Sequence, residues 1–303
     1  MPASVAPDLS IGGVTVHRVV DMDPFALPLN FILPRAERRA LDEERALLEG
    51  HVDFASNDIL LAFQSHLVRA GGLNILVDTC VGEMKPRPRR AEWDRRAASG
   101  YIGRLAAAGC RPEDVDVVLC THLHVDHVGW NTQLRDGRWV PTFPKARYVM
   151  GRADLDHWTA EFARDPSVNH GSFADSVLPV IAAGQAEPVD PGHAVADGAS
   201  ILPLPGHTPG QVGLDVATAD GTRLIVCGDA IHSPVQVLWP GWSSAFCSDP
   251  GQAAATRTGL LERAVSDDVV LIPAHLRASG MRVKRLGGRF RPMFCGCDGA
   301  AAG

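Results

Sequence analysis

Four short, strongly apolar stretches of this chain each end close to a histidine or an aspartate. The stretches cover residues 116–120, 200–204, 222–227 and 268–272, and they are followed by His122, His207, Asp229 and His275, respectively. Short runs rich in Val, Ile and Leu are typical of buried strands. Because residues at the ends of neighbouring strands converge in α/β folds, the pattern predicts a polar site at one edge of a sheet.

The remaining periodicity predicts a layered α/β fold. Further strand-like runs lie near 14–20, 59–69, 73–78, 146–150 and 211–217, and helix-period stretches lie near 35–48, 92–109, 151–163 and 250–265. The runs 59–69 and 73–78 are separated by Gly71-Gly72, which predicts a hairpin and therefore mixed sheets. Asp249-Pro250 predicts a helix start, because an aspartate caps a helix and proline fits its first turn.

We expect the 303 residues to form a single domain, 1–303. No repeat of fixed period and no low-complexity linker divides the sequence. Residues 22–58 and 230–249 are long, poorly periodic and carry aromatic side chains. Such segments are predicted to be insertions that fold over a pocket and shape it.

The composition excludes several classes of protein. With 29 basic and 35 acidic side chains the formal net charge is −6, which argues against a nucleic-acid partner. No apolar run approaches the roughly 18 to 20 residues that span a bilayer, so no membrane segment is expected. The N-terminal residues lack a basic start followed by an apolar core, so we expect no secretory signal and predict a cytoplasmic location.

The cysteines predict reduced thiols. They are seven in number, scattered, and without a C-x-x-C pair, which is not typical of a disulfide framework. Cys227, two residues before Asp229, is expected to be a buried strand thiol. Cys295 and Cys297 lie in a Gly-rich C-terminal stretch, for which an incidental tail and a further metal site are both open interpretations.

Residues 121–127, THLHVDH, are dense in metal-coordinating side chains. In an extended chain His122 and His124 point to the same side and can bind one cation together. Asp126 and His127 are adjacent and would point apart, so a turn here would direct them to a second position. Imidazole with carboxylate suits zinc, manganese, iron or cobalt better than calcium. Surface histidines on a loop are the alternative, which so dense a cluster disfavours.

Taken in order, four motifs resemble the metallo-β-lactamase superfamily of hydrolases. They are H-x-H-x-D-H at 122–127, G-H-T-P-G at 206–210, G-D at 228–229 and a late histidine at 275. The resemblance extends from Leu76-Val77-Asp78-Thr79 to Ala274-His275-Leu276. It implies a four-layer αβ/βα sandwich, in which two mixed sheets are flanked by helices and the metals lie between the sheets at one edge.

The resemblance also implies a ligand set for two divalent metal ions. The first ion would be held by His122, His124 and His207, and the second by Asp126, His127 and His275. Asp229 would bridge the two ions. Zinc is the first expectation, with manganese, iron and cobalt as alternatives. Asp78 would either orient the ligand loop from outside the metal ligands or serve only as the end of its strand.

Within the superfamily the sequence is most similar to the group that holds the N-acyl-homoserine lactonases and the methyl-parathion-hydrolase-like enzymes. His124 stands where flavodiiron proteins have a glutamate, and Asp229 has no counterpart in zinc β-lactamases. The resemblance therefore implies an enzyme that hydrolyses carboxylic esters, lactones above all. Phosphotriester hydrolysis is the alternative, and a non-catalytic metal-dependent binding protein is the third interpretation.

The mechanism implied is attack by a hydroxide held between the two metals. Two cations that share a water lower its pKa toward 7, and the metals polarise the carbonyl oxygen that is attacked. The leaving oxygen would be stabilised by the other metal, by Asp126 or by a protonated His232. Lactonases of the group carry a tyrosine three residues after the bridging aspartate, where this chain has His232. His232 is therefore either a proton donor or part of the pocket wall.

The expected partner is a small ester or lactone, without nucleic acid or membrane. Relatives often form homodimers through the N-terminal segment. Phe25, Leu27, Leu29 and Phe31 are accordingly expected either in a dimer interface or in the core and pocket.

Overall fold

The computed structural model describes residues 8–295 of the chain. Within them, the first sheet has eight strands in the spatial order β1-β2-β4-β5-β6-β9-β10, with β3 paired to β4. The strands are β1 (Leu9–Ile11), β2 (Val14–Pro28), β3 (Val52–Asp53), β4 (Asp58–Ala70), β5 (Leu73–Val77), β6 (Val117–Cys120), β9 (Arg147–Gly151) and β10 (Ala186–Val189). β2, β4 and β5 pair antiparallel, whereas β5, β6, β9 and β10 run parallel. The sheet is therefore mixed.

The second sheet has seven strands among the described residues, in the same order in space as in sequence. They are β11 (Ala194–Ala196), β12 (Ala199–Pro203), β13 (Val212–Ala217), β14 (Arg223–Gly228), β15 (Val270–Pro273), β16 (Gly280–Leu286) and β17 (Arg289–Cys295). Only β14 and β15 pair in parallel. A separate hairpin is formed by β7 (Thr132–Arg135) and β8 (Arg138–Pro141).

The α-helices of the described residues are α1 (Leu29–Ile32), α2 (Arg38–Glu43), α3 (Arg45–Leu48), α4 (Tyr101–Ala107), α5 (Val125–Val128), α6 (Arg152–Arg164), α7 (Leu178–Ala182), α8 (Val235–Leu238) and α9 (Pro250–Ser266). Of these, only α6 and α9 are longer than 7 residues. α9 begins as predicted, because the side chain of Asp249 accepts a hydrogen bond from the backbone N–H of Gln252 at 2.9 Å.

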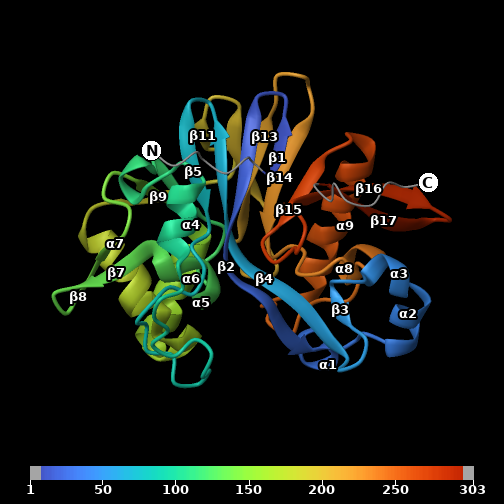
Figure 1. Cartoon of the computed structure of the whole chain (residues 1–303), viewed down its shortest axis with the longest axis horizontal. Coiled ribbons are helices and arrows are strands. Elements are labelled where there is room, and N and C mark those ends of the chain that lie inside the picture. The colour runs from blue at the N-terminus through green and yellow to red at the C-terminus, as the bar shows by residue number, and fades with distance from the viewer. Residues whose placement is uncertain (1–7, 296–303) are drawn as a thin grey trace.

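Four layers result from the alternation of apolar side chains along the strands. Val77 and Val117 point into a core that lies between the two sheets and is shared with Val226 and Ile272. Their neighbours Leu76 and Val118 point outward and pack with Tyr101 and Leu105 of α4. On the far side α9 covers the second sheet. Figure 1 shows α4, α6 and α7 on one side of the paired sheets and α9 on the other, which confirms the predicted sandwich.

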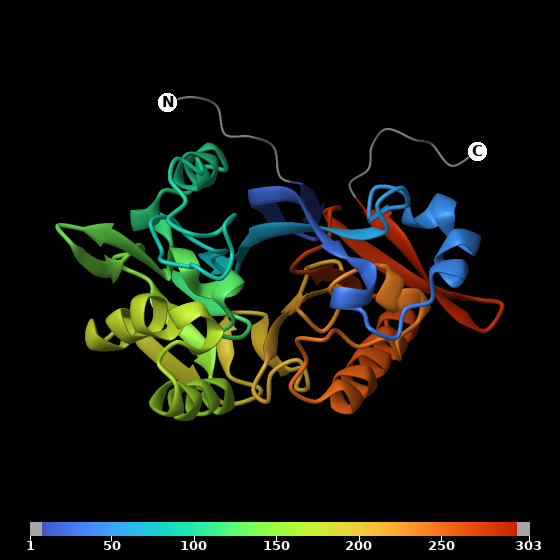
Figure 2. The same ribbon diagram turned by 90° about the horizontal axis from the view of Figure 1, so that it is seen from below.

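The N-terminal strands reach from one half of the molecule to the other. β2 and β4 pair along their whole length, and the segment that follows β2 lies beside β17 in both ribbon views (Figure 1, Figure 2). An ion pair between Glu44 and Arg291 joins the two. This arrangement brings residues 22–58 over the edge of the sheets at which the predicted metal ligands lie.

The structure differs from the sequence prediction in several places. Residues 92–100 are irregular, and of the helix predicted over 92–109 only α4 forms. The reason is that polar side chains here bind to other segments, as in the 2.7 Å ion pair of Arg96 with Asp21, while Arg95 and Ala98 have positive φ. The strand predicted near 14–20 continues to residue 28 as β2, and the hairpin of β16 and β17 was not predicted. Cys297 lies outside the described residues.

Candidate metal centre

The loop that carries four of the predicted ligands follows β6. All four residues of β6 are buried, so the core fixes the point at which the loop begins. His122 and His124 lie in the connection, and Asp126 and His127 lie in the single turn of α5. The turn changes the direction of the chain, so the two pairs of side chains face two different positions.

Three imidazole nitrogens converge at the first position. Nε2 of His122 and Nε2 of His207 each lie 2.9 Å from Nδ1 of His124. Nitrogen ligands about 2.0–2.1 Å from a tetrahedral ion lie roughly 3.3 Å apart. The spacing of these three atoms is therefore close to that of three ligands of one ion.

A carboxylate and two imidazoles converge at the second position. Oδ2 of Asp126 lies 3.7 Å from Nε2 of His127 and 3.6 Å from Nε2 of His275. Their coordinating atoms all lie within 4.8 Å of one another. The two groups of ligands are adjacent, since the rings of His122 and His127 are 4.0 Å apart.

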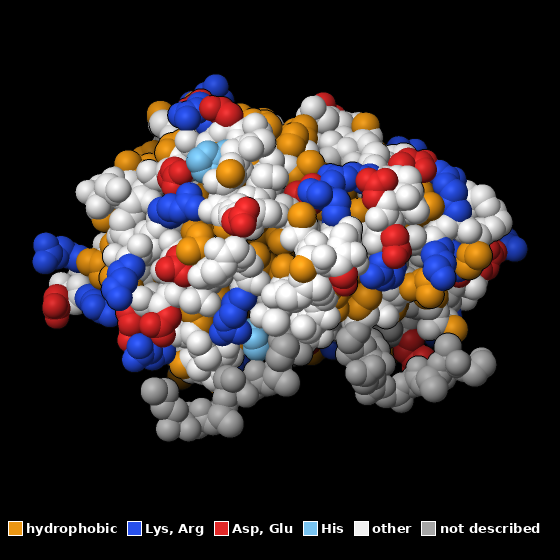
Figure 3. Space-filling view, turned by 90° about the horizontal axis from the view of Figure 1, so that it is seen from above, with side chains coloured by type: hydrophobic (Ala, Val, Ile, Leu, Met, Phe, Trp, Pro, Cys, Tyr) orange, Lys and Arg blue, Asp and Glu red, His pale blue; other side chains and the backbone are white. Residues whose placement is uncertain are grey.

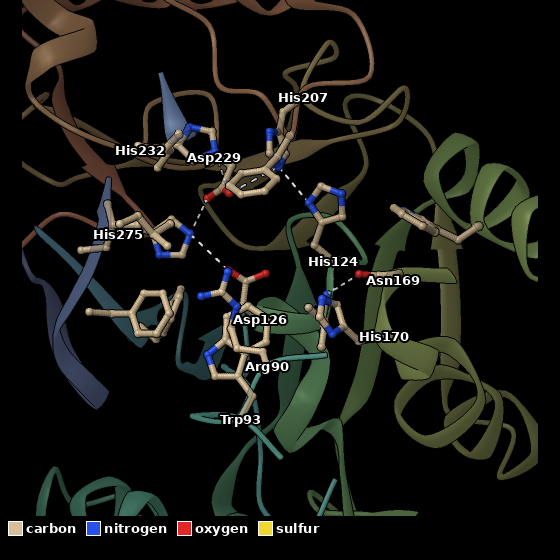
Figure 4. A pocket seen from close by; sticks show the side chains of 18 residues that line it. Arg90, Trp93, His124, Asp126, Asn169, His170, His207, Asp229, His232 and His275 are labelled. Carbon is tan, nitrogen blue, oxygen red and sulfur yellow. Dashed lines mark hydrogen bonds and ion pairs between the residues drawn. The ribbon is translucent and has the colours of Figure 1, made fainter. Parts of the chain in front are cut away.

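Asp229 lies between the two positions (Figure 4). Its Oδ2 is 3.3 Å from Nε2 of His207 in the first group and 3.4 Å from Nε2 of His127 in the second. Its Oδ1 is 3.2 Å from Nε2 of His275. One carboxylate thus faces ligands of both groups, which is the position that a bridging ligand requires.

Partners on the outer side orient several of the imidazoles. Nδ1 of His127 lies 2.9 Å from Oδ2 of Asp78, and Nδ1 of His275 lies 3.0 Å from the carbonyl oxygen of Ala62. Nδ1 of His122 lies 3.1 Å from Oγ1 of Thr121. Hydrogen bonds of this kind fix the tautomer, so that Nε2 of each ring is left free to bind a metal.

Burial and nearby charge set the protonation of the histidines. Burial lowers the pKa of His124 to about 4, and burial also lowers the pKa of His122 and His207. Burial acts in the same direction on His127 and His275, but Asp229 and the other carboxylates outweigh it and raise the pKa of both. The first group is therefore neutral at pH 7, as ligands must be, and the second lies in a negative field that attracts a cation.

Unpaired buried atoms show that the residues present fit a metal. Among the described residues, Nε2 of His127 and Oδ1 of Asp229 are buried and lack a hydrogen-bond partner. A buried polar atom left unpaired costs about 1–3 kcal/mol. A cation bound to these atoms removes that cost, and a set of imidazole nitrogens and carboxylate oxygens suits zinc and similar ions.

His232 lies against this cluster. Its Nε2 is 3.2 Å from Oδ2 of Asp229, and its ring is 4.8 Å from the ring of His207. Its backbone N–H donates to Oε1 of Gln236 at 2.7 Å, which anchors the turn that carries it. His232 is buried and faces the same cavity as the predicted ligands.

A cavity of about 220 Å³ opens in front of the ligands. Residues 22–58 contribute Phe25, Leu27 and Ile32 to its wall, and residues 230–249 contribute His232 and Phe246. Two further segments also line it, with Arg90 and Trp93 from one and Asn169 and His170 from the other. The walls are mainly apolar, which is typical of small-molecule sites.

Two residues outside the four sequence motifs bind the ligand loop, and the sequence analysis did not predict them as site residues. The side-chain amide of Asn169 donates to the carbonyl oxygen of Leu123 at 2.7 Å and accepts from the backbone N–H of Val125 at 2.9 Å. Asp154 accepts from the backbone N–H of Leu123 at 2.8 Å. No motif surrounds Asn169, and Asp154 lies in the predicted helix over 151–163 without any motif of its own. Only their position after folding marks them as part of the site.

Predicted ligands at strand ends, a carboxylate between their two groups and two packed sheets are together typical of a class of metal-dependent hydrolases. Residues 64–275 match the family model described as "Metallo-beta-lactamase superfamily", and the chain belongs to this superfamily. In the part of the chain that the structure describes, no helix is long and apolar enough to cross a membrane.

The names of related proteins describe different activities. Metallo-beta-lactamase domain-containing protein 1 of Xenopus laevis is 27% identical over 229 residues, which is 76% of this chain and 77% of that protein. An N-acyl homoserine lactonase of Bacillus sp is 25% identical over 146 residues, 48% of each chain. Ribonuclease TTHA0252 of Thermus thermophilus is 27% identical over 177 residues, which is 57% of this chain and 36% of that protein.

Solved structures share the fold over nearly the whole chain. The hydrolase AbOPH superposes with a TM-score of 0.77 at 20% identity and covers 97% of this chain and 98% of its own. AidC, described as a dizinc quorum-quenching lactonase, superposes with a TM-score of 0.72 at 20% identity and covers 94% and 95%. At these identities the similarity shows the fold alone.

Proposed function

We propose that the protein is a dinuclear metal-dependent hydrolase of carboxylic esters and that lactones are its principal substrates. The observation that carries the proposal is the position of Asp229, whose two oxygens face ligands of both groups. An apolar cavity in front of these ligands suits a small uncharged or weakly polar scissile group.

The chain offers three ligands to each of two ions and one ligand to both. His122, His124 and His207 would hold the first ion, and Asp126, His127 and His275 the second, with Asp229 shared. Bound there, two divalent cations supply a water of lowered pKa and positive charge for the developing oxyanion. Zinc is the first expectation, because AidC is described as dizinc, and manganese, iron and cobalt accept the same donors.

The chain's own residues then have three tasks. The walls of the cavity exclude bulk water and so strengthen the electrostatic interactions inside. His232, with Nε2 held 3.2 Å from Oδ2 of Asp229, would donate the proton from this atom to the leaving oxygen. Asp126 also presents a carboxylate to the cavity, and this carboxylate would receive or return a proton during the reaction.

Two comparisons support lactones as the first substrate class. One related protein is named an N-acyl homoserine lactonase, and AidC is described as a quorum-quenching lactonase. Phosphotriesters are the second candidate, because His232 stands where lactonases of this group carry a tyrosine. The same arrangement of ligands serves attack on phosphorus.

Charge argues against a nucleic-acid substrate, although one relative is a ribonuclease. The formal net charge is −6, and the face drawn in Figure 3 has basic and acidic side chains interspersed. Such a surface lacks the basic footprint that phosphate backbones require. Homodimerisation stays a prediction: Phe25 and Leu27 line the cavity, Leu29 is buried, and Phe31 is exposed.

Proton release in a pH-stat tests the proposed function. Zinc-loaded protein is offered γ- and δ-lactones, linear aryl esters and a phosphotriester in turn, and a chelator-treated sample is the control. We expect turnover that the chelator abolishes and that is fastest on lactones. Fastest turnover on the phosphotriester would favour the second candidate, and two bound metals without turnover on any substrate would indicate a binding protein.

A further inference from the structure

One cation in the cavity wall has no polar partner. Arg90 lines the cavity, yet among residues 8–295 its guanidinium makes neither a hydrogen bond nor an ion pair. It lies instead over two aromatic rings, 5.4 Å from the centroid of Phe25 and 5.0 Å from that of Trp93. An arginine stays charged at every physiological pH, so this charge is held beside the cavity without a counter-ion.

Two more hydrogen-bonding groups beside Arg90 are unused. Nε1 of Trp93 and Nδ1 of His170 are buried and lack a partner in the described part of the chain. The rings of Trp93 and His170 lie 5.5 Å apart, and both residues line the cavity. Figure 4 shows Arg90 and Trp93 together, across the cavity from His207 and His232. A buried polar group without a partner calls for an explanation, and here two such groups flank Arg90, whose charge lies in the cavity wall.

The fold holds this side of the cavity firmly. Arg87 donates to both oxygens of Asp175 at 2.7 Å and 2.8 Å and to the carbonyl oxygen of His170 at 3.2 Å. The side chain of Arg87 is fully buried. The segment of Arg90 is thereby joined to the segment of His170, where Asn169 and His170 both have φ above +50°. Backbone strain of this kind persists where surrounding contacts enforce it, and it gathers at ligand sites.

The charges of the cavity also favour an anion. Its acidic wall residues are Asp126 and Asp229, and in the proposed function both are ligands of divalent cations. Two such cations exceed the charge of two carboxylates, and Arg90 adds a further positive charge. A positive, mainly apolar cavity attracts an anionic substrate more strongly than a neutral one.

We infer that Arg90, with Trp93 and His170 beside it, binds a carboxylate at the end of the substrate that is remote from the scissile ester. The inference rests on the proposed function and narrows it to half-esters of dicarboxylic acids and to lactones that bear a carboxylate. Water adds across the ester bond. A half-ester gives a dicarboxylate, an alcohol and one proton, and a lactone that bears a carboxylate gives one hydroxy-dicarboxylate and one proton. A planar guanidinium pairs with a carboxylate through two parallel hydrogen bonds.

A matched pair of substrates tests the subsite. The first is a mono-aryl ester of glutaric or adipic acid, and the second is the same ester with a carboxamide in place of the free carboxylate. In Arg90→Gln we expect kcat/KM for the carboxylate substrate to fall by at least about 30-fold, and for the carboxamide by less than about threefold. Arg90→Lys should recover part of the loss. Arg138→Gln, which changes an exposed arginine outside the cavity wall, should change neither value.

Equilibrium binding separates the subsite from the reaction. Calorimetric titration of the zinc-loaded protein with glutarate or adipate should give a Kd that rises at least about tenfold in Arg90→Gln, whereas the matching diamides, which carry no carboxylate, should bind both proteins alike. This result without turnover of any ester would retain the subsite and reject the proposed function. Active wild-type enzyme with equal losses on both substrates, at unchanged melting temperature and metal content, would overturn the subsite and leave the hydrolase.

Discussion

The carboxylate of Asp78 accepts a hydrogen bond from Nδ1 of His127 at 2.9 Å, although 49 residues separate the two in sequence. The same carboxylate accepts from the backbone N–H of Thr121 at 2.8 Å and from its hydroxyl at 2.9 Å. Asp78 follows β5 and Thr121 follows β6, so one side chain joins the ends of two neighbouring strands. It thereby aims a ligand of the second position while it fixes the start of the ligand loop.

Replacing Asp78 tests this orienting role. Asp78→Asn keeps the shape and tolerates the φ of +58° at this position, but it weakens the acceptor for His127. We expect metal affinity to fall by about 10- to 100-fold, measured by competition with a chromogenic chelator. Asp116→Asn is the matched control, since Asp116 precedes the opposite end of β6. Equal metal affinity in both variants would show that Asp78 only ends its strand and does not orient a metal ligand.

Removing one ligand tests the metal assignment. His122→Ala deletes a nitrogen of the first position, so zinc content should fall by at least one ion per chain and kcat/KM by about three orders of magnitude. Zinc is measured by mass spectrometry after dialysis. His193→Ala, which removes a histidine paired with Glu187 away from the cluster, should keep both values. Full zinc occupancy in His122→Ala would refute the assignment.

The role of His232 is tested by the leaving group. If Nε2 of His232 protonates the leaving oxygen, His232→Ala should lower kcat by about 100-fold for an alkyl ester and by less than about fivefold for a 4-nitrophenyl ester, which needs no proton. Zinc content should not change. A kcat/KM equal to that of the wild type on both esters would assign His232 to the pocket wall.

Acid should destabilise the protein through His51. This residue is buried and stacks on Phe294 at 4.7 Å, and burial lowers its pKa to about 4. In the unfolded chain the pKa is near 6.5, so as the pH falls below 6.5 only the unfolded state gains a proton. The folded state then loses about 1 kcal/mol between about pH 7.5 and pH 5.5.

Urea unfolding at both pH values measures this loss. In His51→Leu the dependence of the free energy of unfolding on pH should be smaller by about that amount. His193→Leu, a change at a half-exposed histidine, is the control. The same pH dependence in the wild type and in His51→Leu would show that His51 does not contribute.

The strands and their polar ends could be predicted because the signals are local. β6 and β15 read as continuous apolar runs, since both faces of these strands are covered, and α9 starts at its aspartate cap. The helix predicted over 92–109 was wrong in its first part. There the hydrogen bonds of the chain go to distant groups, as from Arg96 to Asp21, and contacts of this kind override the local preference for a helix.

The sequence by itself determined the class of fold and the order of the candidate ligands, because the candidate ligands lie within a few residues of strands that the apolar residues define. Only the tertiary structure decided what faces those ligands. Arg90 and Trp93 lie in a segment that forms neither helix nor strand, although a helix was predicted from residue 92, and His170 lies in a single 3-10 turn (Val168–Gly171). Their positions depend on buried ion pairs such as Arg87 with Asp175, which form between residues far apart in sequence and only when the chain has folded.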